Sequence, residues 1–342
     1  MMKKITFILS TLLMGQLAAQ DIHFSQTAQT PLLINPACAG VYDGWERVNV
    51  NHRNQWLGAA TQFMTSSVAA DINLGKDDFR DKAHVGLGLL FYNDIGGDSR
   101  FGMQTGALTL SGILPVGGGH TISAGIQGGF GNRSADFSTL TFNSQWNGNA
   151  YDTDIQTGES AGFSGYRYID ASAGAYYVYD ASKSSFRRKD NFKLQVGLGA
   201  FHLNRPALSF SGITGDRMYR KFVAHASVTA DISMTDWCVD ASVVQSMQGP
   251  HQETILGIIS KYRFKDGTKI TGHSQDAYFG FGTYFRVNDA ICPTIQLDWK
   301  GFHLGISYDA TISKMREAYT GSLEFSLAYT NLNHALFKSR RK

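Results

Sequence analysis

Apolar and polar residues alternate strictly along several stretches of this chain, most regularly in its second half. From Phe302 to Tyr308 every second residue is apolar, and a histidine, a glycine and a serine separate them. The same two-residue period runs from Leu323 to Tyr329. Because successive side chains of a strand point to opposite faces, this period predicts strands with one apolar and one polar face.

Weaker alternation elsewhere extends the prediction to about fourteen strands. Many of them span about ten residues or more, the length that a tilted strand needs to cross the hydrocarbon layer of a membrane. An even number suits a closed single-chain barrel, which leaves no unpaired strand edge in lipid. The expected strands are 46–54, 63–73, 83–92, 101–114, 119–130, 167–179, 192–203, 221–232, 235–246, 253–264, 276–287, 290–299, 302–310 and 319–330.

The links between these strands differ greatly in length. Tight links predict hairpins, whereas the link 131–166 is long and rich in Asn, Ser, Gly, Asp and Thr. Membrane barrels carry short periplasmic turns and longer outer loops, so we expect this link outside the cell. A soluble β-sandwich is the competing fold, and long strands with tight hairpins count against it. The tight links are Met234–Thr235, Asn288–Asp289 and Lys300–Gly301.

The N-terminus has the pattern of an export signal. Lys3 and Lys4 precede an apolar stretch from Ile5 to Leu17, which is too short to span a bilayer as a helix. Small residues follow, and we expect cleavage after Ala19. Loss of the two lysines lowers the formal charge from +3 to about +1, which leaves no nucleic-acid footprint.

Composition supports a membrane barrel. Charged residues make up 17% of the chain, below the usual share of about 25%, and the exported part has no apolar run long enough for a transmembrane helix. We therefore predict an all-β fold, a single transmembrane antiparallel β-barrel with an N-terminal extended, plug-like segment. The expected division is a signal peptide at 1–19, the N-terminal segment at 20–45, the outer-membrane barrel at 46–332 and a basic C-terminal tail at 333–342.

The segment after the signal peptide is unlike a strand, because Pro31 and Pro36 cannot both lie in a sheet interior. It reads Phe-Ser-Gln, then Pro-Leu-Leu-Ile-Asn-Pro-Ala, then a glycine, and the first strand ends in Arg-Asn-Gln-Trp. We expect it to plug the lumen or to dock a partner. The candidate residues are Phe24, Ser25, Gln26, Asn35, Pro36, Ala37, Gly40, Arg53, Gln55 and Trp56.

Three elements occur here in order: Phe-Ser-Gln, Pro-Leu-x-x-Asn-Pro-Ala-x-x-Gly and Arg-x-Gln-Trp. In them the chain resembles the PorP/SprF family of outer-membrane proteins, which is tied to type IX secretion and gliding in Bacteroidota. The resemblance implies that the barrel helps to secrete or anchor a large cell-surface partner, such as a gliding adhesin. Its expected partners are outer-membrane lipid, that secreted protein and type IX secretion components. Asn35-Pro36-Ala37 is also similar to the N-terminal hatch of FadL-type transporters, so passive transport of hydrophobic compounds is the alternative function.

Motifs for catalysis and cofactors are weak. The histidines are scattered, and the sequence contains neither H-E-x-x-H nor G-x-S-x-G. We expect no enzyme, cofactor or metal, although an outer-membrane hydrolase with a site assembled across strands is a third possibility. The stretch from Asp152 to Glu159 is similar to a calcium loop, but its glycine falls one place late. The cysteines Cys38, Cys238 and Cys292 allow one disulfide without indicating the pair.

Overall fold

The computed structural model of the chain describes residues 21–55, 63–77, 82–136, 140–158, 165–183, 191–208, 216–267, 276–313, 321–332 and 336. The expected signal peptide, most of the C-terminal tail and Trp56 lie outside these residues. Among the described residues, no helix is both long enough and apolar enough to cross a membrane.

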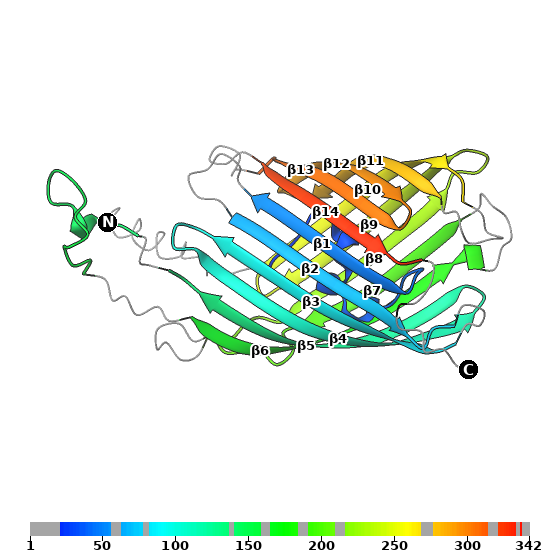
Figure 1. Ribbon diagram of the computed structural model, residues 1–342, viewed down its shortest axis with the longest axis horizontal. Helices are drawn as coiled ribbons and strands as arrows, with labels where there is room; N and C mark the ends of the chain where they lie inside the picture. The colour runs from blue at the N-terminus through cyan, green and yellow to red at the C-terminus, as the bar shows by residue number, and fades with distance from the viewer. Residues whose placement is uncertain are drawn as a thin grey trace, which may run out of the picture.

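Fourteen antiparallel strands form one closed barrel, as the alternation predicts (Figure 1). Each strand pairs with its neighbours in sequence, and the first pairs with the last, for example Val50 with Leu327. The closed ladder leaves no sheet edge. The strands are β1 (Glu46–Gln55), β2 (Phe63–Leu74), β3 (His84–Gly96), β4 (Phe101–Gly117), β5 (His120–Ser134), β6 (Tyr166–Asp180), β7 (Phe192–Phe201), β8 (Lys221–Asp231), β9 (Trp237–Gln248), β10 (His251–Lys265), β11 (Ala277–Arg286), β12 (Ala290–Trp299), β13 (Phe302–Thr311) and β14 (Ser322–Thr330).

The two faces of the strands separate as their sequence period predicts. Leu304 and Ile306 are 44% and 42% exposed on the outer surface, whereas Ser307 between them and Tyr308 is 1% exposed inside. Outward apolar residues recur around the barrel, where a lipid layer would solvate them. The inner face is polar, and the N-terminal segment covers much of it.

The two ends of the barrel differ. The start of β1 and the end of β14 share one end, which we call the turn end, with the tight links at Met234 and Lys300. These residues have positive φ values of 63° and 51°, as tight hairpins require. The other end, which we call the loop end, carries the long links after β5 and β7 and lies on the left in Figure 1.

The N-terminal segment folds into short helical turns within the barrel, the dark blue coils behind β1 and β2 in Figure 1. These are η1 (Thr27–Gln29), α2 (Pro31–Ile34) and η2 (Pro36–Cys38). The expectation of an extended segment is therefore wrong for these residues. A proline at the first position of a helix is favourable, and both prolines occupy such positions. The Asn35 side chain also caps η2 by accepting a hydrogen bond from the Ala37 N–H at 2.9 Å.

Candidate functional site inside the barrel

The N-terminal segment crosses the lumen from one end to the other. Asp21 lies at the loop end, where its backbone N–H donates to the side chain of Gln248 at the end of β9. Trp45 lies at the turn end, where its N–H donates to the carbonyl of Asn331 just after β14. The chain thus passes through the barrel from the loop end to the turn end before β1 begins.

The Phe-Ser-Gln motif is attached to β14 through its backbone. The two carboxylate oxygens of Glu324 accept the N–H groups of Ser25 and Gln26, both at 2.8 Å. Glu324 is fully buried, and Phe24 is 3% exposed. One acidic side chain on the lumen face therefore fixes the direction of two successive residues, with charge-assisted hydrogen bonds.

A buried charge network supports this attachment. Asp309 on β13 accepts hydrogen bonds from Arg53 at 2.9 Å, from Arg286 at 3.1 Å and from the Ser25 hydroxyl at 2.9 Å. Arg53 also donates to the carbonyl of His23 at 3.0 Å. The arginine of the Arg-x-Gln-Trp motif thus holds the Phe-Ser-Gln motif, which explains why the two short motifs occur together in one sequence.

The side chain of Gln26 packs against β13 at a glycine, Gly305. Its amide oxygen accepts from the Ser326 hydroxyl at 2.7 Å, and its amide nitrogen donates to Ser307 at 3.3 Å. A Cβ on Gly305 would overlap this amide oxygen. Glycine on the lumen face of β13 therefore provides the space for the glutamine.

The Asn-Pro-Ala motif is attached to the opposite wall. The Asn35 amide donates to the carbonyl of Ala175 on β6 at 2.9 Å and lies 3.1 Å from Nε2 of His225 on β8. The Ser123 hydroxyl on β5 donates to the carbonyl of Ala37 at 2.8 Å. Glycines line this contact, and a Cβ at Gly125 would approach the Pro36 carbonyl oxygen to 2.6 Å.

Gly40 forms the third attachment. Its N–H donates to Asp71 on β2 at 2.8 Å, and its φ of 74° is one that side-chain-bearing residues rarely adopt. A Cβ there would also lie 2.6 Å from the amide oxygen of Asn73. Arg47 pairs with the same Asp71 at 2.8 Å. Both conformation and space therefore require glycine at this position.

Asp21 and His202 form a fourth attachment at the loop end. His202 follows β7 with a φ of 56°, which ends the strand two residues before the expected end and lets its Nε2 reach Asp21 at 2.6 Å. Its Nδ1 lies 3.0 Å from Asp170, and Lys221 lies 3.6 Å from Asp21. Burial opposes the imidazolium, but Asp21 and Asp170 raise the pKa of His202 to about 9. Burial would raise the pKa of Asp21, yet His202 and Lys221 hold it well below its usual range.

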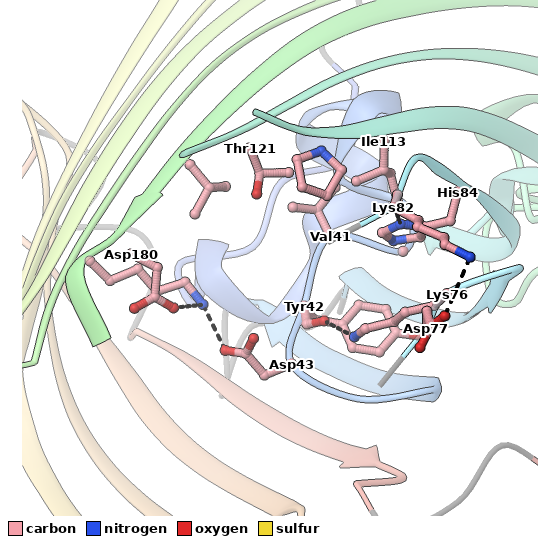
Figure 2. A pocket seen from close by; sticks show the side chains of 14 residues that line it. Val41, Tyr42, Asp43, Lys76, Asp77, Lys82, His84, Ile113, Thr121 and Asp180 are labelled. Carbon is pink, nitrogen blue, oxygen red and sulfur yellow. Dashed lines mark hydrogen bonds and ion pairs between the residues drawn. The ribbon is translucent and has the colours of Figure 1, made fainter. Parts of the chain in front are cut away.

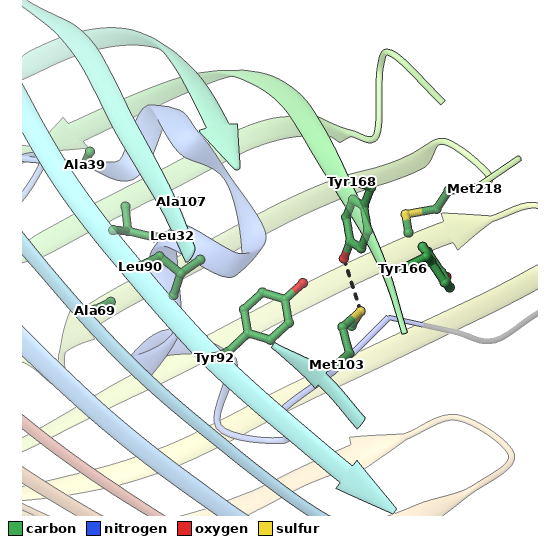
Figure 3. Close-up of a cluster of buried hydrophobic side chains, with 10 residues drawn as sticks. All are labelled: Leu32, Ala39, Ala69, Leu90, Tyr92, Met103, Ala107, Tyr166, Tyr168 and Met218. Carbon is green, nitrogen blue, oxygen red and sulfur yellow. Dashed lines mark hydrogen bonds between the residues drawn. The ribbon is translucent and has the colours of Figure 1, made fainter. Parts of the chain in front are cut away.

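Apolar contacts complete the packing of the segment. Leu32 and Ala39 are fully or nearly fully buried and belong to a cluster with Leu90 on β3 (Figure 3). Toward the loop end the cluster continues along the inner wall to Tyr168 and Met218. The segment is therefore held by apolar packing against the barrel wall as well as by hydrogen bonds and ion pairs.

Cavities lie beside the segment. A cavity of about 180 Å³ lies against β7 to β9 and is lined by His225, Gln195 and Ser227, among others. A second, of about 70 Å³, lies at the turn end around Tyr42 and Asp43 (Figure 2). Lys193 lines both and pairs with Asp43 at 3.1 Å. These cavities admit water or a small molecule but not a polypeptide.

The structure divides the candidate residues among separate attachments, and Gly40 forms one of its own on β2. Phe24, Ser25, Gln26 and Arg53 share one site, and Asn35, Pro36 and Ala37 share another. Gln55 ends β1 and pairs with Phe63 on β2, apart from these attachments. Trp56 lies outside the described residues. The three cysteines are free and buried, so none forms a disulfide.

The sequence over residues 16–329 matches the family described as type IX secretion system membrane protein PorP/SprF. The chain belongs to the PorP/SprF family. Family membership implies association with type IX secretion components. A comparison with curated protein sequences finds no match.

Solved membrane barrels are similar to this PorP/SprF barrel at low sequence identity. The translocator domain of autotransporter NalP from Neisseria meningitidis is 9% identical, with a TM-score of 0.43 over 89% of this chain and 96% of that one. A deltaS2 mutant of the monoaromatic hydrocarbon channel TodX is 11% identical, with a TM-score of 0.48 over 90% and 94%. BamA from Haemophilus ducreyi lacking POTRA domains 1–3 is 7% identical, with a TM-score of 0.41 over 84% and 70%.

Apart from Arg53, the barrel residues that hold the segment were not among the sequence candidates. Glu324, Asp309 and Asp71 all lie on polar faces of expected strands. A signal for them does exist. An acidic residue in a membrane-crossing strand is costly and usually has a specific partner, so these carboxylates could have been singled out.

Proposed function

We propose that this protein is an outer-membrane component of type IX secretion that helps to secrete or anchor a large cell-surface protein, such as a gliding adhesin. It acts by binding and catalyses no reaction. Family membership supports the link to type IX secretion. The choice of binding over conduction rests on a feature of the lumen.

That feature is the attachment of the N-terminal segment at both walls and both ends. Releasing it would break the hydrogen bonds that Glu324, Asp309, Asp71 and Asn35 make between the segment and the barrel. Leaving a buried polar group unsatisfied costs about 1–3 kcal/mol for each group. A polypeptide therefore has no path through the resting barrel. A partner that meets such a barrel would bind to it from outside.

The loop end offers a surface suited to a protein partner. Trp146 and Tyr151 pair across a small hairpin with ring centroids 5.1 Å apart, and they are 50% and 51% exposed. This hairpin stands away from the strands (Figure 1, green loop at the left). Exposed aromatic residues of this kind are enriched among the residues that dominate protein–protein binding.

The test is capture of partners from native membranes with a tagged barrel. The unaltered barrel should retrieve a large surface protein together with secretion components. The double variant W146A/Y151A should retrieve at least about tenfold less of that protein, which corresponds to 1.4 kcal/mol or more. A matched control is V287A/I312A, which removes exposed apolar side chains at the same end. Failure of the unaltered barrel to retrieve any surface protein would contradict the proposal.

Transport of hydrophobic compounds is the competing function, and the 180 Å³ cavity is the observation that bears on it. A transporter of this kind predicts that cells without the barrel lose uptake of such compounds and keep their surface proteins. The binding function predicts the reverse, so one deletion strain assayed for both properties separates the two.

A further inference from the structure

Four exposed arginines gather at the loop end over β6 to β8. Arg167 lies at the start of β6, Arg205 follows β7, and Arg217 and Arg220 precede β8. We call them the rim arginines. Among the described residues, none of them forms an ion pair, and only Arg220 has a side-chain hydrogen bond, which its Nε donates to the Leu203 carbonyl at 3.3 Å.

Backbone contacts bring the rim arginines together. The N–H of Leu203 donates to the carbonyl of Ala171 at 2.9 Å, and the Asn204 amide donates to the carbonyl of Ile169 at 2.7 Å. Arg205 directly follows Asn204, which is bonded to Ile169 on β6. Ile169 is two positions from Arg167, so Arg205 and Arg167 lie near each other. A bridge between Ala207 and Arg217 joins the two halves of the link.

Alternation indicates the outward direction of two of these side chains, Arg167 and Arg217. Met218 is 5% exposed and packs inside with Tyr166 and Tyr168 (Figure 3), so its neighbour Arg217 is exposed on the other side. On β6, Tyr166 and Tyr168 point inward, and Arg167 between them points outward. Arg167 and Arg217 thus belong to the outer surface, and Arg205 and Arg220 are exposed in the link beside them.

An apolar surface lies directly next to them. Ile169 is 71% exposed, Phe222 is 49% exposed and Leu203 is 37% exposed. Outward apolar residues on a membrane barrel mark the lipid-facing band. The rim arginines therefore lie where that band ends, at the level of lipid headgroups in the leaflet of the loop end.

We propose that the rim arginines bind the phosphate groups of anionic lipids in that leaflet. Arginine offers a planar fork of donors that matches phosphate oxygens, and its charge is retained at any physiological pH. Guanidinium groups that form no ion pair with the described residues, beside exposed apolar side chains, suit a ligand with a phosphate head and acyl chains. This lipid site is independent of the aromatic hairpin assigned above to a protein partner.

The test uses the full barrel in detergent with diphosphorylated lipid A as the probe, and native mass spectrometry to count bound lipid. The variant R205Q/R217Q/R220Q should bind the lipid at least tenfold more weakly than the unaltered protein. The control variant K82Q/K265Q/K300Q removes equal charge from exposed residues at the turn end and should bind as the unaltered protein does. A heat-dependent shift in gel mobility checks that each variant forms the barrel.

Three results would contradict lipid binding by the rim arginines. Equal lipid binding by the rim variant and the unaltered barrel would overturn the proposal. An equal loss in both variants would show a dependence on net charge alone and would overturn it too. Dephosphorylated lipid A should bind tenfold more weakly to the unaltered barrel, and undiminished binding would show that phosphate is not recognised.

Discussion

At the scale of single residues, Asp309 has the most demanding role in the lumen. It accepts hydrogen bonds from two arginines of the barrel and from Ser25 of the segment, with 1% of its side chain exposed. Removing one partner of a buried network leaves the other charges desolvated and unpaired, which costs about 3–5 kcal/mol. We expect D309A to lower the unfolding free energy by that amount in denaturant titrations of the barrel.

Asp289 provides the matched control for this substitution. It pairs with the same Arg286, but its side chain is 43% exposed. Exposed ion pairs contribute about 0–1 kcal/mol, so D289A should have a small effect. Similar losses for D309A and D289A would show that burial of the network is not what stabilises the segment.

The pair of Asp21 and His202 predicts a dependence on pH. The pKa of His202 is raised from the ordinary value of 6.5 to about 9, so the charged imidazole is stabilised by folding. Its contribution is complete below about pH 6.5 and is lost as the pH rises through 9. The neighbouring charged groups Asp170 and Lys221 are present in both the unaltered protein and the variant.

The measurement compares the unfolding free energy of the unaltered barrel with that of H202Q across this range. At pH 6 the variant should be clearly less stable, because glutamine cannot supply the positive charge. At pH 9.5 the difference should be much smaller. A difference that stays constant over the range would rule out the charged form of His202 as the stabilising species.

Sequence alone identified one side of several contacts between the segment and the barrel, but neither Asp21 nor His202. Ser25, Gln26, Asn35 and Arg53 stand in short, distinctive motifs, so they could be selected as candidates. Their partners are single polar residues in strands that are otherwise similar to one another. Ser25 and Glu324 lie 299 positions apart, and no local pattern encodes a pairing at that distance.

At the scale of elements, the strands were predictable and the helical turns were not. All fourteen expected strands are present with small shifts at their ends, because a two-residue period sustained over ten residues has one structural solution. The segment 27–38 is too short and irregular to show a repeating pattern of apolar and polar residues that would predict a helix or a strand. Its prolines are compatible with an extended chain and with helix starts, and packing against the barrel decides between them.

Gly125 and Gly128 on β5 allow a test of how closely that packing fits. A methyl group at Gly125 would meet the backbone of Pro36 and Ala37 at 2.6 and 2.7 Å, whereas Gly128 has open space around its Cβ position. We expect G125A to destabilise the barrel by about 1–3 kcal/mol through overpacking. G128A should be neutral or slightly stabilising, since it restricts only the unfolded chain. Denaturant titration of both variants measures this, and equal effects would contradict a close contact at η2.

At the scale of the whole molecule, the direction of the N-terminal segment was beyond prediction. Composition and motifs indicated that the segment is buried inside or beneath the barrel. They did not indicate the end of the barrel at which the segment starts. The direction depends on which end holds Asp21. The contacts of Asp21 with His202, Lys221 and Gln248 place it at the loop end, whereas β1 starts at the turn end.

This direction predicts on which side of the membrane Asp21 lies. If long loops face the outside, as in other membrane barrels, Asp21 faces the outside too, while the end of β14 faces the periplasm. A short peptide tag inserted between Gln20 and Asp21 should therefore bind antibody on intact cells. A tag after Lys342 should bind antibody only after the outer membrane is made permeable. The physical reason is that the membrane separates the loop end of the barrel from the turn end.

A tag between Asn147 and Gly148 serves as the surface control, because these residues lie in the exposed hairpin at the loop end. Gel mobility before and after heating shows whether each tagged chain still forms the barrel. Surface labelling of the hairpin tag with no labelling of the Asp21 tag, in chains that do form it, would mean that the segment enters from the periplasmic side. In that case the contact between Asp21 and His202 could not exist in the cell, and Asp170 would be the remaining carboxylate partner of His202.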